Sequence, residues 1–354
     1  MNRIKSSQLL TILLLSGAWS VLCMTRAASG ADLLGILPGT LMQLAVCVPM
    51  LLPERYQCSM FRIVSESRSL GAVYVLFFLL WGAHGFAQFW AVSAEINLAV
   101  QGRMTAAVLI TLVCLYTCSL GLRSMARCAP IVTAVLLLSV LVLLLGAKGR
   151  IRPDRLIPGT EGLFSAALSY FSMGGELAAA WILLGTVQTG KRRAVLGLLA
   201  GKAALAFLTV FRCITVCGRL TALSEHPFFT LITLTQPLQS QRADALFILV
   251  FVMLYVMHIT LQTGVIAHLL HAMFPKLRFA APLSLGVMLL LSPWMAHASG
   301  HVLYSILILL TAGILPLWLC LKRRKPHESH PQTAVPDPAA CPADDGMQQA
   351  GADY

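Results

Sequence analysis

Residues Ser169–Trp181 read SYFSMGGELAAAW, and they lie in a chain that is otherwise dominated by apolar residues. Gly174 and Gly175 directly precede Glu176 in the middle of a hydrophobic segment. Glycine costs about 1 kcal/mol relative to alanine in a helix interior, and a charge at mid-membrane costs roughly 2.5–3.5 kcal/mol on insertion scales. We therefore expect the helix to break at residues 173–175. Close packing of helices is the other common use of such glycines.

The composition identifies the class of protein. The chain has 354 residues, of which 58% are hydrophobic and only 11% charged, and its mean hydropathy is +0.79. Soluble domains carry about 25% charged residues, so this chain is predicted to be an all-α polytopic membrane protein in a lipid bilayer. Its net charge of +12 is assigned to short loops that orient helices, and no nucleic-acid partner is expected.

Apolar runs predict ten membrane spans, with the sixth containing the glycine pair. The predicted spans are residues 8–25, 32–52, 70–92, 104–122, 129–147, 161–187, 194–216, 244–270, 279–296 and 300–321. A reading of the first span as a cleaved signal peptide is the alternative, but it would leave an odd number of helices. An even number places both termini on one side of the membrane.

The basic residues favour termini in the cytoplasm. Sixteen of the 26 Lys and Arg residues fall in loops that would then be inside, and eight fall in loops outside. The basic loop 148–155 opposes this trend. Residues 1–325 are predicted to form one ten-helix domain, and the Pro-rich residues 326–354 a disordered cytoplasmic tail that carries no function or holds a short docking motif.

Two of the predicted loops are long enough to contain structure. Residues 53–69 mix Arg with apolar residues and resemble a helix lying at the inner interface. Residues 218–242 carry apolar residues between two prolines and are expected to pack as a re-entrant or surface segment. The ten cysteines contain no CxxC pair, so they are assigned to helix packing.

A broken helix creates a polar site in the membrane. The N-terminus of a half-helix offers free N–H groups and the positive end of its dipole, which stabilise Glu176 or hold the carboxylate of a bound amino acid. Transporters with this device often carry it twice, in inverted five-helix repeats. The matching position is Ser16–Gly17 in the first span, so we expect five plus five helices with the first and sixth broken.

Further polar residues inside the spans are candidates for the same site. His84 with Gln88, and His258 with Gln262, lie one turn apart on their helices, and either hydrogen-bond other helices or line a cavity. Lys202 is expected to extend to the inner surface, with pairing to a carboxylate as the alternative. The candidate ligand-binding residues are Ser16, Gly17, Ala18, Trp19, Phe171, Ser172, Gly174, Gly175 and Glu176.

Signatures of enzymes are missing from the sequence. It contains no Walker loop, GxSxG, HExxH or dinucleotide fingerprint. Only 14 residues are acidic, and most lie in predicted loops, so paired catalytic carboxylates are not expected. We predict no enzymatic activity, no catalytic residues, no metal site and no cofactor.

Three stretches resemble one family. IKSSQLLTILLLS (4–16), FSAALSYFSMGGE (164–176) and HPFFTLITLTQPLQSQRADALFILVFVM (226–253) are similar to the B-subunit permease-like proteins of GerA-type spore germinant receptors, within the amino acid–polyamine–organocation superfamily. The most specific element is Arg-Ala-Asp-Ala-Leu-Phe at 242–247. The resemblance covers roughly residues 4–321.

The resemblance implies a LeuT-like fold in the inner spore membrane or cell membrane, with A- and C-type subunits as partners and a small germinant, such as an amino acid, as ligand. The first helix departs from the family pattern, because it has Ser16–Gly17 and Trp19 where a Gly-Thr pair is usual, and lacks the following proline. A germinant-sensing subunit is the leading hypothesis. A proton-coupled amino acid transporter and a scaffold subunit that no longer binds ligand are the alternatives.

Overall fold

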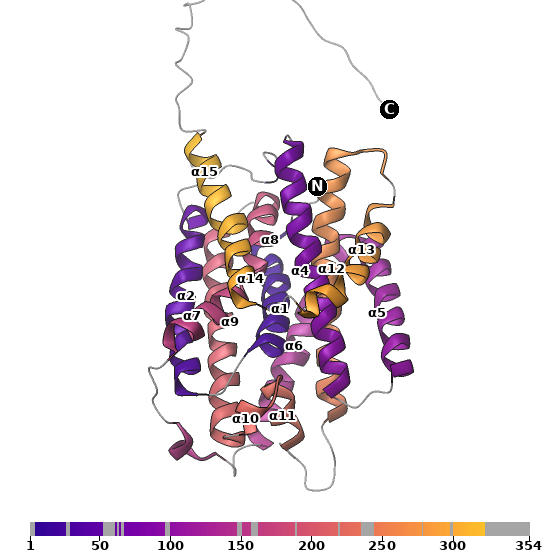
Figure 1. The fold of residues 1–354 in the computed structure, drawn as a ribbon. Helices are drawn as coiled ribbons and strands as arrows, with labels where there is room; N and C mark the ends of the chain where they lie inside the picture. The colour runs from indigo at the N-terminus through magenta and orange to yellow at the C-terminus, as the bar shows by residue number, and fades with distance from the viewer. Residues whose placement is uncertain are drawn as a thin grey trace, which may run out of the picture.

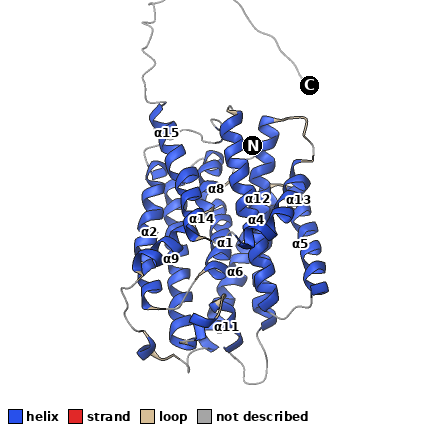
Figure 2. Ribbon diagram, viewed as in Figure 1, coloured by secondary structure: helices blue, strands red, loops and turns tan. Residues whose placement is uncertain are grey.

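The computed structural model describes most of the chain as a helical bundle. The described residues are 4–25, 29–51, 61, 64, 67–95, 100–146, 151–156, 162–187, 190–218, 220–234, 244–277, 279–297 and 300–322. These residues form helices and no strand, apart from one isolated bridge between Ile4 and Val187 (Figure 2). The tail 326–354, most of the predicted interface helix and residues 235–243 lie outside the described part.

Nine helices of the described residues are long and apolar enough to cross a membrane. They are α1 (Ser6–Met24), α2 (Gly30–Leu51), α4 (Arg68–Glu95), α5 (Val100–Leu120), α6 (Leu122–Gly146), α9 (Lys191–Arg212) continuing into the π-helical η5 (Cys213–Cys217), α12 (Asp244–Met273), α13 (Ala280–His297), and the run of α14 (His301–Ile308), η6 (Leu309–Ile314) and α15 (Leu315–Lys322). The remaining predicted span is split into α7 (Leu163–Ser172) and α8 (Glu176–Leu183), followed by η4 (Leu184–Thr186). Every predicted span thus has its helix.

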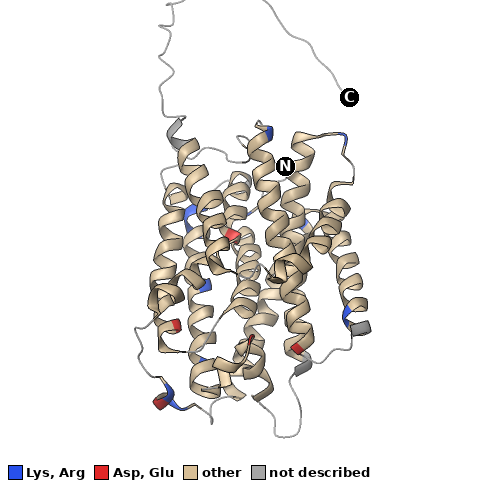
Figure 3. Ribbon diagram, in the orientation of Figure 1, with Lys and Arg blue, Asp and Glu red and all other residues tan. Residues whose placement is uncertain are grey.

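Helix α1 lies inside the bundle, against α6, α9 and α12 (Figure 1). Most of its side chains are buried, including Trp19, whose ring packs on Phe251 and Tyr255 with centroids 4.7 and 4.9 Å apart. Large apolar side chains such as Leu290 and Trp294 are instead exposed on the outer helices. The ribbons of the helices carry few charged residues (Figure 3), as expected for a surface that faces lipid.

Helix α2 packs closely along α7 through a pair of glycines spaced four residues apart. A methyl group at Gly35 would lie 2.6 Å from the Ala166 Cβ, and one at Gly39 would lie 2.8 Å from the Ala167 carbonyl oxygen. This is the small-xxx-small spacing that brings membrane helices together. The contact holds α7 against α2 in the turns that precede the break of the sixth span.

The two ends of the bundle differ. The start of α1 and the end of α15 lie at the upper end in Figure 1, consistent with an even number of crossings. At the other end lie η3 (Pro153–Arg155), α10 (Leu220–Leu223) and α11 (Pro227–Leu234). Within the predicted segment 218–242, α11 buries Phe228, Phe229 and Leu231 against the bundle, so its packing is confirmed for the described residues.

The basic loop 148–155 has a structural use in its described part. The Arg155 guanidinium donates to the Val216 carbonyl oxygen, and the Arg152 backbone N–H donates to the Thr215 carbonyl oxygen at 3.0 Å. Both acceptors lie in η5, where the seventh span ends and its last carbonyls lack helical partners. A cation at a helix C-terminus also interacts favourably with the dipole. The contact with η5 gives Arg155 a structural role, although its loop opposes the excess of basic residues in the loops predicted to be cytoplasmic.

Candidate functional site

The sixth span breaks where the sequence predicts. Helix α7 ends at Ser172 and α8 begins at Glu176, with Gly175 at its N-cap. Between them the backbone turns on itself, because Gly174 N–H donates to the Phe171 oxygen and Leu177 N–H to the Gly174 oxygen, both at 3.0 Å. The Gln43 side chain of α2 donates to the Tyr170 oxygen at 3.1 Å. The break is therefore held by local bonds and by a neighbouring helix.

Glu176 forms an ion pair with Lys202, and both side chains are fully buried. The Lys202 Nζ also donates to the Met173 carbonyl oxygen at 2.7 Å, which ties α9 directly to the broken backbone. The expectation that Lys202 extends to the inner surface is wrong. A lysine within reach of a buried carboxylate and a free carbonyl gains more by satisfying both than by stretching to the interface, because each charge would otherwise be unpaired in a medium of low dielectric constant.

Helix α1 is not broken at Ser16–Gly17. It is one continuous helix from Ser6 to Met24, so the prediction of a broken first helix is wrong. A single glycine costs only about 1 kcal/mol, which is less than the cost of exposing unpaired backbone groups inside the bundle. Gly17 instead lies against the ion pair, since a methyl group there would be 3.4 Å from Glu176 Oε1 and 3.5 Å from Lys202 Cδ.

Trp81 of α4 covers the break. An ideal Cβ on Gly175 would lie 2.1 Å from the Trp81 ring, so only glycine allows the indole to approach this closely. The same ring has its centroid 5.7 Å from Tyr304, 6.0 Å from His84 and 6.5 Å from His258. Trp81 therefore separates the ion pair from a cluster of polar rings, and sequence analysis did not select it.

The two histidines predicted in the spans form hydrogen bonds between helices. His84 Nδ1 lies 2.8 Å from the Tyr304 hydroxyl of α14, and His258 Nδ1 lies 2.9 Å from the Ser16 hydroxyl of α1. Gln88 Nε2 lies 3.5 Å from His84 Nε2. Gln262 is fully buried, and neither of its side-chain polar atoms has a hydrogen-bond partner in the described structure.

A cavity of about 510 Å³ reaches this cluster from the end of the bundle that carries α10 and α11. The residues that line it include His84, Gln88, Tyr304 and His301. His258 and Gln262 do not line it. The Ser172 hydroxyl, at the end of α7, lies 3.4 Å from His301 Nδ1. The cavity thus comes close to the broken helix without exposing Glu176.

The remaining predicted site residues lie either in the packed interior or beside a different groove. Ala18 and Trp19 are buried in the packing of α1, and neither lines this cavity. Phe171 faces a different groove, between α2, α7 and the last span. The structure brings Gly17 and Glu176 together with Lys202, and Gly174 and Gly175 form the adjoining break. Lys202 itself was left out of the predicted site, although its position inside an apolar span was a usable signal.

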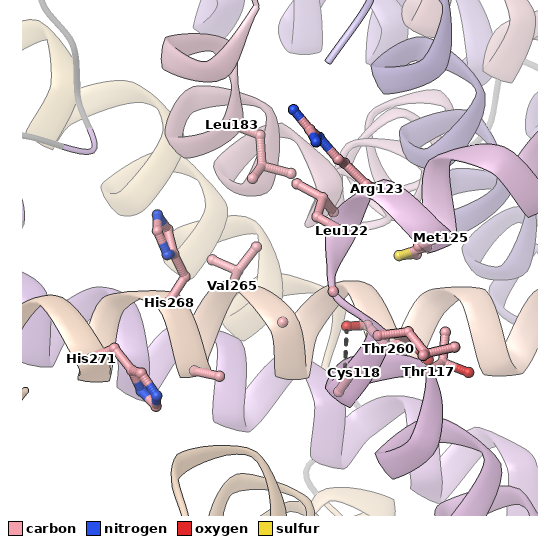
Figure 4. A pocket seen from close by; sticks show the side chains of 14 residues that line it. Thr117, Cys118, Leu122, Arg123, Met125, Leu183, Thr260, Val265, His268 and His271 are labelled. Carbon is pink, nitrogen blue, oxygen red and sulfur yellow. Dashed lines mark hydrogen bonds between the residues drawn. The ribbon is translucent and has the colours of Figure 1, made fainter. Parts of the chain in front are cut away.

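A second cavity, of about 340 Å³, lies at the opposite end of α8 (Figure 4). Its lining includes Arg123, His268 and Leu183, together with Cys118, whose thiol donates to the Thr260 carbonyl oxygen at 3.7 Å. Figure 4 labels Arg123 and His268 among the side chains that line it. His268 is therefore separated from the ion pair and belongs to this second cavity.

Comparison with known proteins gives no assignment: no protein-family model and no curated protein matches the chain.

Proposed function

We propose that the chain is a membrane receptor subunit that binds a small ligand beside the helix break and signals by a movement of the helices joined there. One observation carries the proposal. Glu176 and Lys202, both fully buried, join α8, α9 and the broken backbone at a single point. Charged residues in membrane interiors are costly, and they usually mark functional sites. A ligand with its own charges competes for these contacts and so changes how the three segments are held.

The ligand class that fits this site best is an amino acid. Its carboxylate matches Lys202 and the N-terminus of α8, and its ammonium group matches Glu176. The resemblance to the B-subunits of GerA-type receptors supports germinant recognition, with A- and C-type subunits as partners and the inner spore membrane or cell membrane as location. A LeuT-like arrangement of five plus five helices belongs to the same proposal, with a break retained in the sixth span alone.

A proton-coupled amino acid transporter is the second candidate. It is favoured by the proximity of the ion pair to two histidines, because Trp81 touches Gly175 on one side and lies near His84 and His258 on the other. Ionisable groups arranged in this way serve as proton relays in many transporters. Sensing and transport differ in whether the ligand crosses the membrane.

The test combines spores and proteoliposomes. A deletion strain is complemented with the wild-type chain, Gly174→Leu, Glu176→Gln or the control Gly286→Leu, whose Cβ position has no neighbour within 4 Å. We expect the first two variants to lose the germination response at normal protein levels and the control to keep it. Proteoliposomes with the purified chain should bind labelled amino acids without accumulating them. Accumulation driven by a proton gradient would identify a transporter, and normal germination by both site variants would refute the sensing site.

A further inference from the structure

The end of the bundle that carries α10 and α11 contains a polar site that is separate from the ion pair. A further hollow, of about 510 Å³ like the cavity that reaches His84, lies between the end of α4 and the link between α10 and α11. It shares Ala91, Ser224, Glu225 and His226 with the cavity that reaches His84. The two hollows thus meet at these four residues.

His226 has an unused hydrogen-bonding atom at this meeting point. The residue is only 5% exposed, and its Nδ1 lies 3.0 Å from the Cys23 carbonyl oxygen at the end of α1. A carbonyl only accepts hydrogen bonds, so Nδ1 must carry the proton, and in the neutral ring Nε2 is an acceptor. No hydrogen-bond partner of the buried Nε2 is present in the described structure. A buried polar atom of this kind normally has a partner.

Two carboxylates border the same site. Glu95 Oε1, at the end of α4, accepts a hydrogen bond from the Ser224 hydroxyl at 3.0 Å. That hydroxyl is itself fixed, because it accepts from the Thr230 hydroxyl at 2.8 Å and from the His226 N–H at 3.2 Å. Glu225 is exposed and lines both hollows. Among the described residues that line the two hollows there is no Lys or Arg, although the chain carries a net charge of +12.

These groups select for a cation that donates hydrogen bonds. Two carboxylates attract positive charge, and a buried imidazole nitrogen accepts an N–H. Within the described residues, no three His, Cys, Asp or Glu side chains are close enough to hold a metal ion. An organic ammonium group supplies both the positive charge and the N–H donors that match these acceptors.

We propose that this site binds the primary ammonium group of a small organic molecule, with Glu95 and Glu225 supplying negative charge and His226 Nε2 accepting a hydrogen bond. The bond between His226 and Cys23 connects the site to α1, which passes the ion pair at Gly17. Helix α1 thereby connects the ammonium site at His226 to the ion pair of Glu176 and Lys202. The proposal does not depend on the receptor or transporter function.

The test measures binding of benzylammonium to the purified full chain in nanodiscs of zwitterionic lipid, by saturation-transfer NMR and titration. Benzyl alcohol lacks the charge, and benzyltrimethylammonium lacks the N–H donors. We expect both comparators to bind about tenfold or more weakly than benzylammonium, as charged hydrogen bonds are lost. Equal binding of benzyl alcohol, or no saturable binding of benzylammonium up to millimolar concentration, would overturn the proposal.

Variants assign the binding to this site. Glu225→Gln and Glu95→Gln remove one charge each, and His226→Asn keeps a donor for the Cys23 carbonyl while removing the Nε2 acceptor. Each should weaken benzylammonium binding at least about fivefold. The control Asp154→Asn removes an exposed carboxylate of η3, outside the lining of both hollows, and should change affinity less than about twofold.

Thermal unfolding of each variant is measured alongside, so that a loss of folding is recognised. An equal loss in Asp154→Asn and Glu225→Gln would show a general effect of surface charge and refute the site.

Discussion

Lys202 and Glu176 show how a buried charge is made tolerable. Removing two charges from water is expensive, and their attraction compensates only when further hydrogen bonds satisfy the pair. Lys202 meets this condition, because it also donates to the Met173 carbonyl oxygen. Glu176 Oε2 has no hydrogen-bond partner in the described structure. The pair is therefore sensitive to the loss of either member.

We predict that Lys202→Met lowers the free energy of unfolding by about 3–5 kcal/mol, because it leaves a buried carboxylate unpaired. Glu176→Gln should cost less than Lys202→Met, since an amide oxygen still accepts from the ammonium group. The double variant should recover most of the loss. A double-mutant cycle on the detergent-solubilised protein, followed by thermal unfolding, gives the coupling between the two residues. Additive losses would contradict the pair.

The hydroxyl of Tyr304 is expected to matter through His84. Tyr304→Phe removes a buried hydrogen bond of 2.8 Å and leaves His84 Nδ1 without that partner, so stability should fall by about 1–2 kcal/mol. The matched control is Tyr116→Phe, because Tyr116 is 66% exposed on the outside of α5 and should change stability by less than about 0.5 kcal/mol. Chemical unfolding in mixed micelles measures both. Equal effects would contradict the role of the Tyr304–His84 bond.

At the scale of elements, the contrast between α1 and the sixth span explains what the sequence predicts and what it does not. The Gly174–Gly175–Glu176 run combines two weak helix formers with a carboxylate, and its break is local enough to be predicted. Ser16–Gly17 offers only one glycine, and whether α1 breaks there depends on the helices packed around it. The roles of Lys202 and Trp81 could not be predicted for the same reason. They depend on which faces of α9 and α4 pack against the break.

The break should be sensitive to any side chain on Gly175. Gly175→Ala places a methyl group where the Trp81 ring now lies, 2.1 Å from the ideal Cβ position, so we expect a loss of about 1–3 kcal/mol as the indole is displaced. Gly286→Ala is the control, since its Cβ position has no neighbour within 4 Å. Trp81→Phe should relieve part of the loss in the double variant. Thermal unfolding compares the four proteins, and equal stability of the two glycine variants would contradict the close approach.

At the scale of the whole molecule, the number of crossings and their positions follow from hydropathy, because lipid imposes a minimum length of apolar helix. The described residues contain nine helices long and apolar enough to cross a membrane, and the remaining predicted span corresponds to the short helices α7 and α8. The arrangement of those helices does not follow from hydropathy. It depends on contacts such as Gly35 and Gly39 against α7, which join residues far apart in the sequence.

Orientation in the membrane can be measured with fusions. The excess of basic residues in alternate loops predicts that the chain termini face the cytoplasm and the link at Leu223–Ser224 faces outside. A fluorescent protein fused after Lys325 should fluoresce, and alkaline phosphatase should be inactive there but active when inserted after Leu223. The reverse pattern would invert the topology and place the cavity with Glu95 and Glu225 on the cytoplasmic side.

The ion pair also has a consequence for how the protein is made. Glu176 and Lys202 are 26 residues apart and belong to consecutive crossings, so the carboxylate emerges from the ribosome before its partner. Until α9 follows, Glu176 is an uncompensated charge that opposes partition into lipid. We expect the translocon to retain α7 and α8 until Lys202 arrives and to release the three segments together. In that case the pair influences the order of membrane integration as well as the stability of the finished bundle.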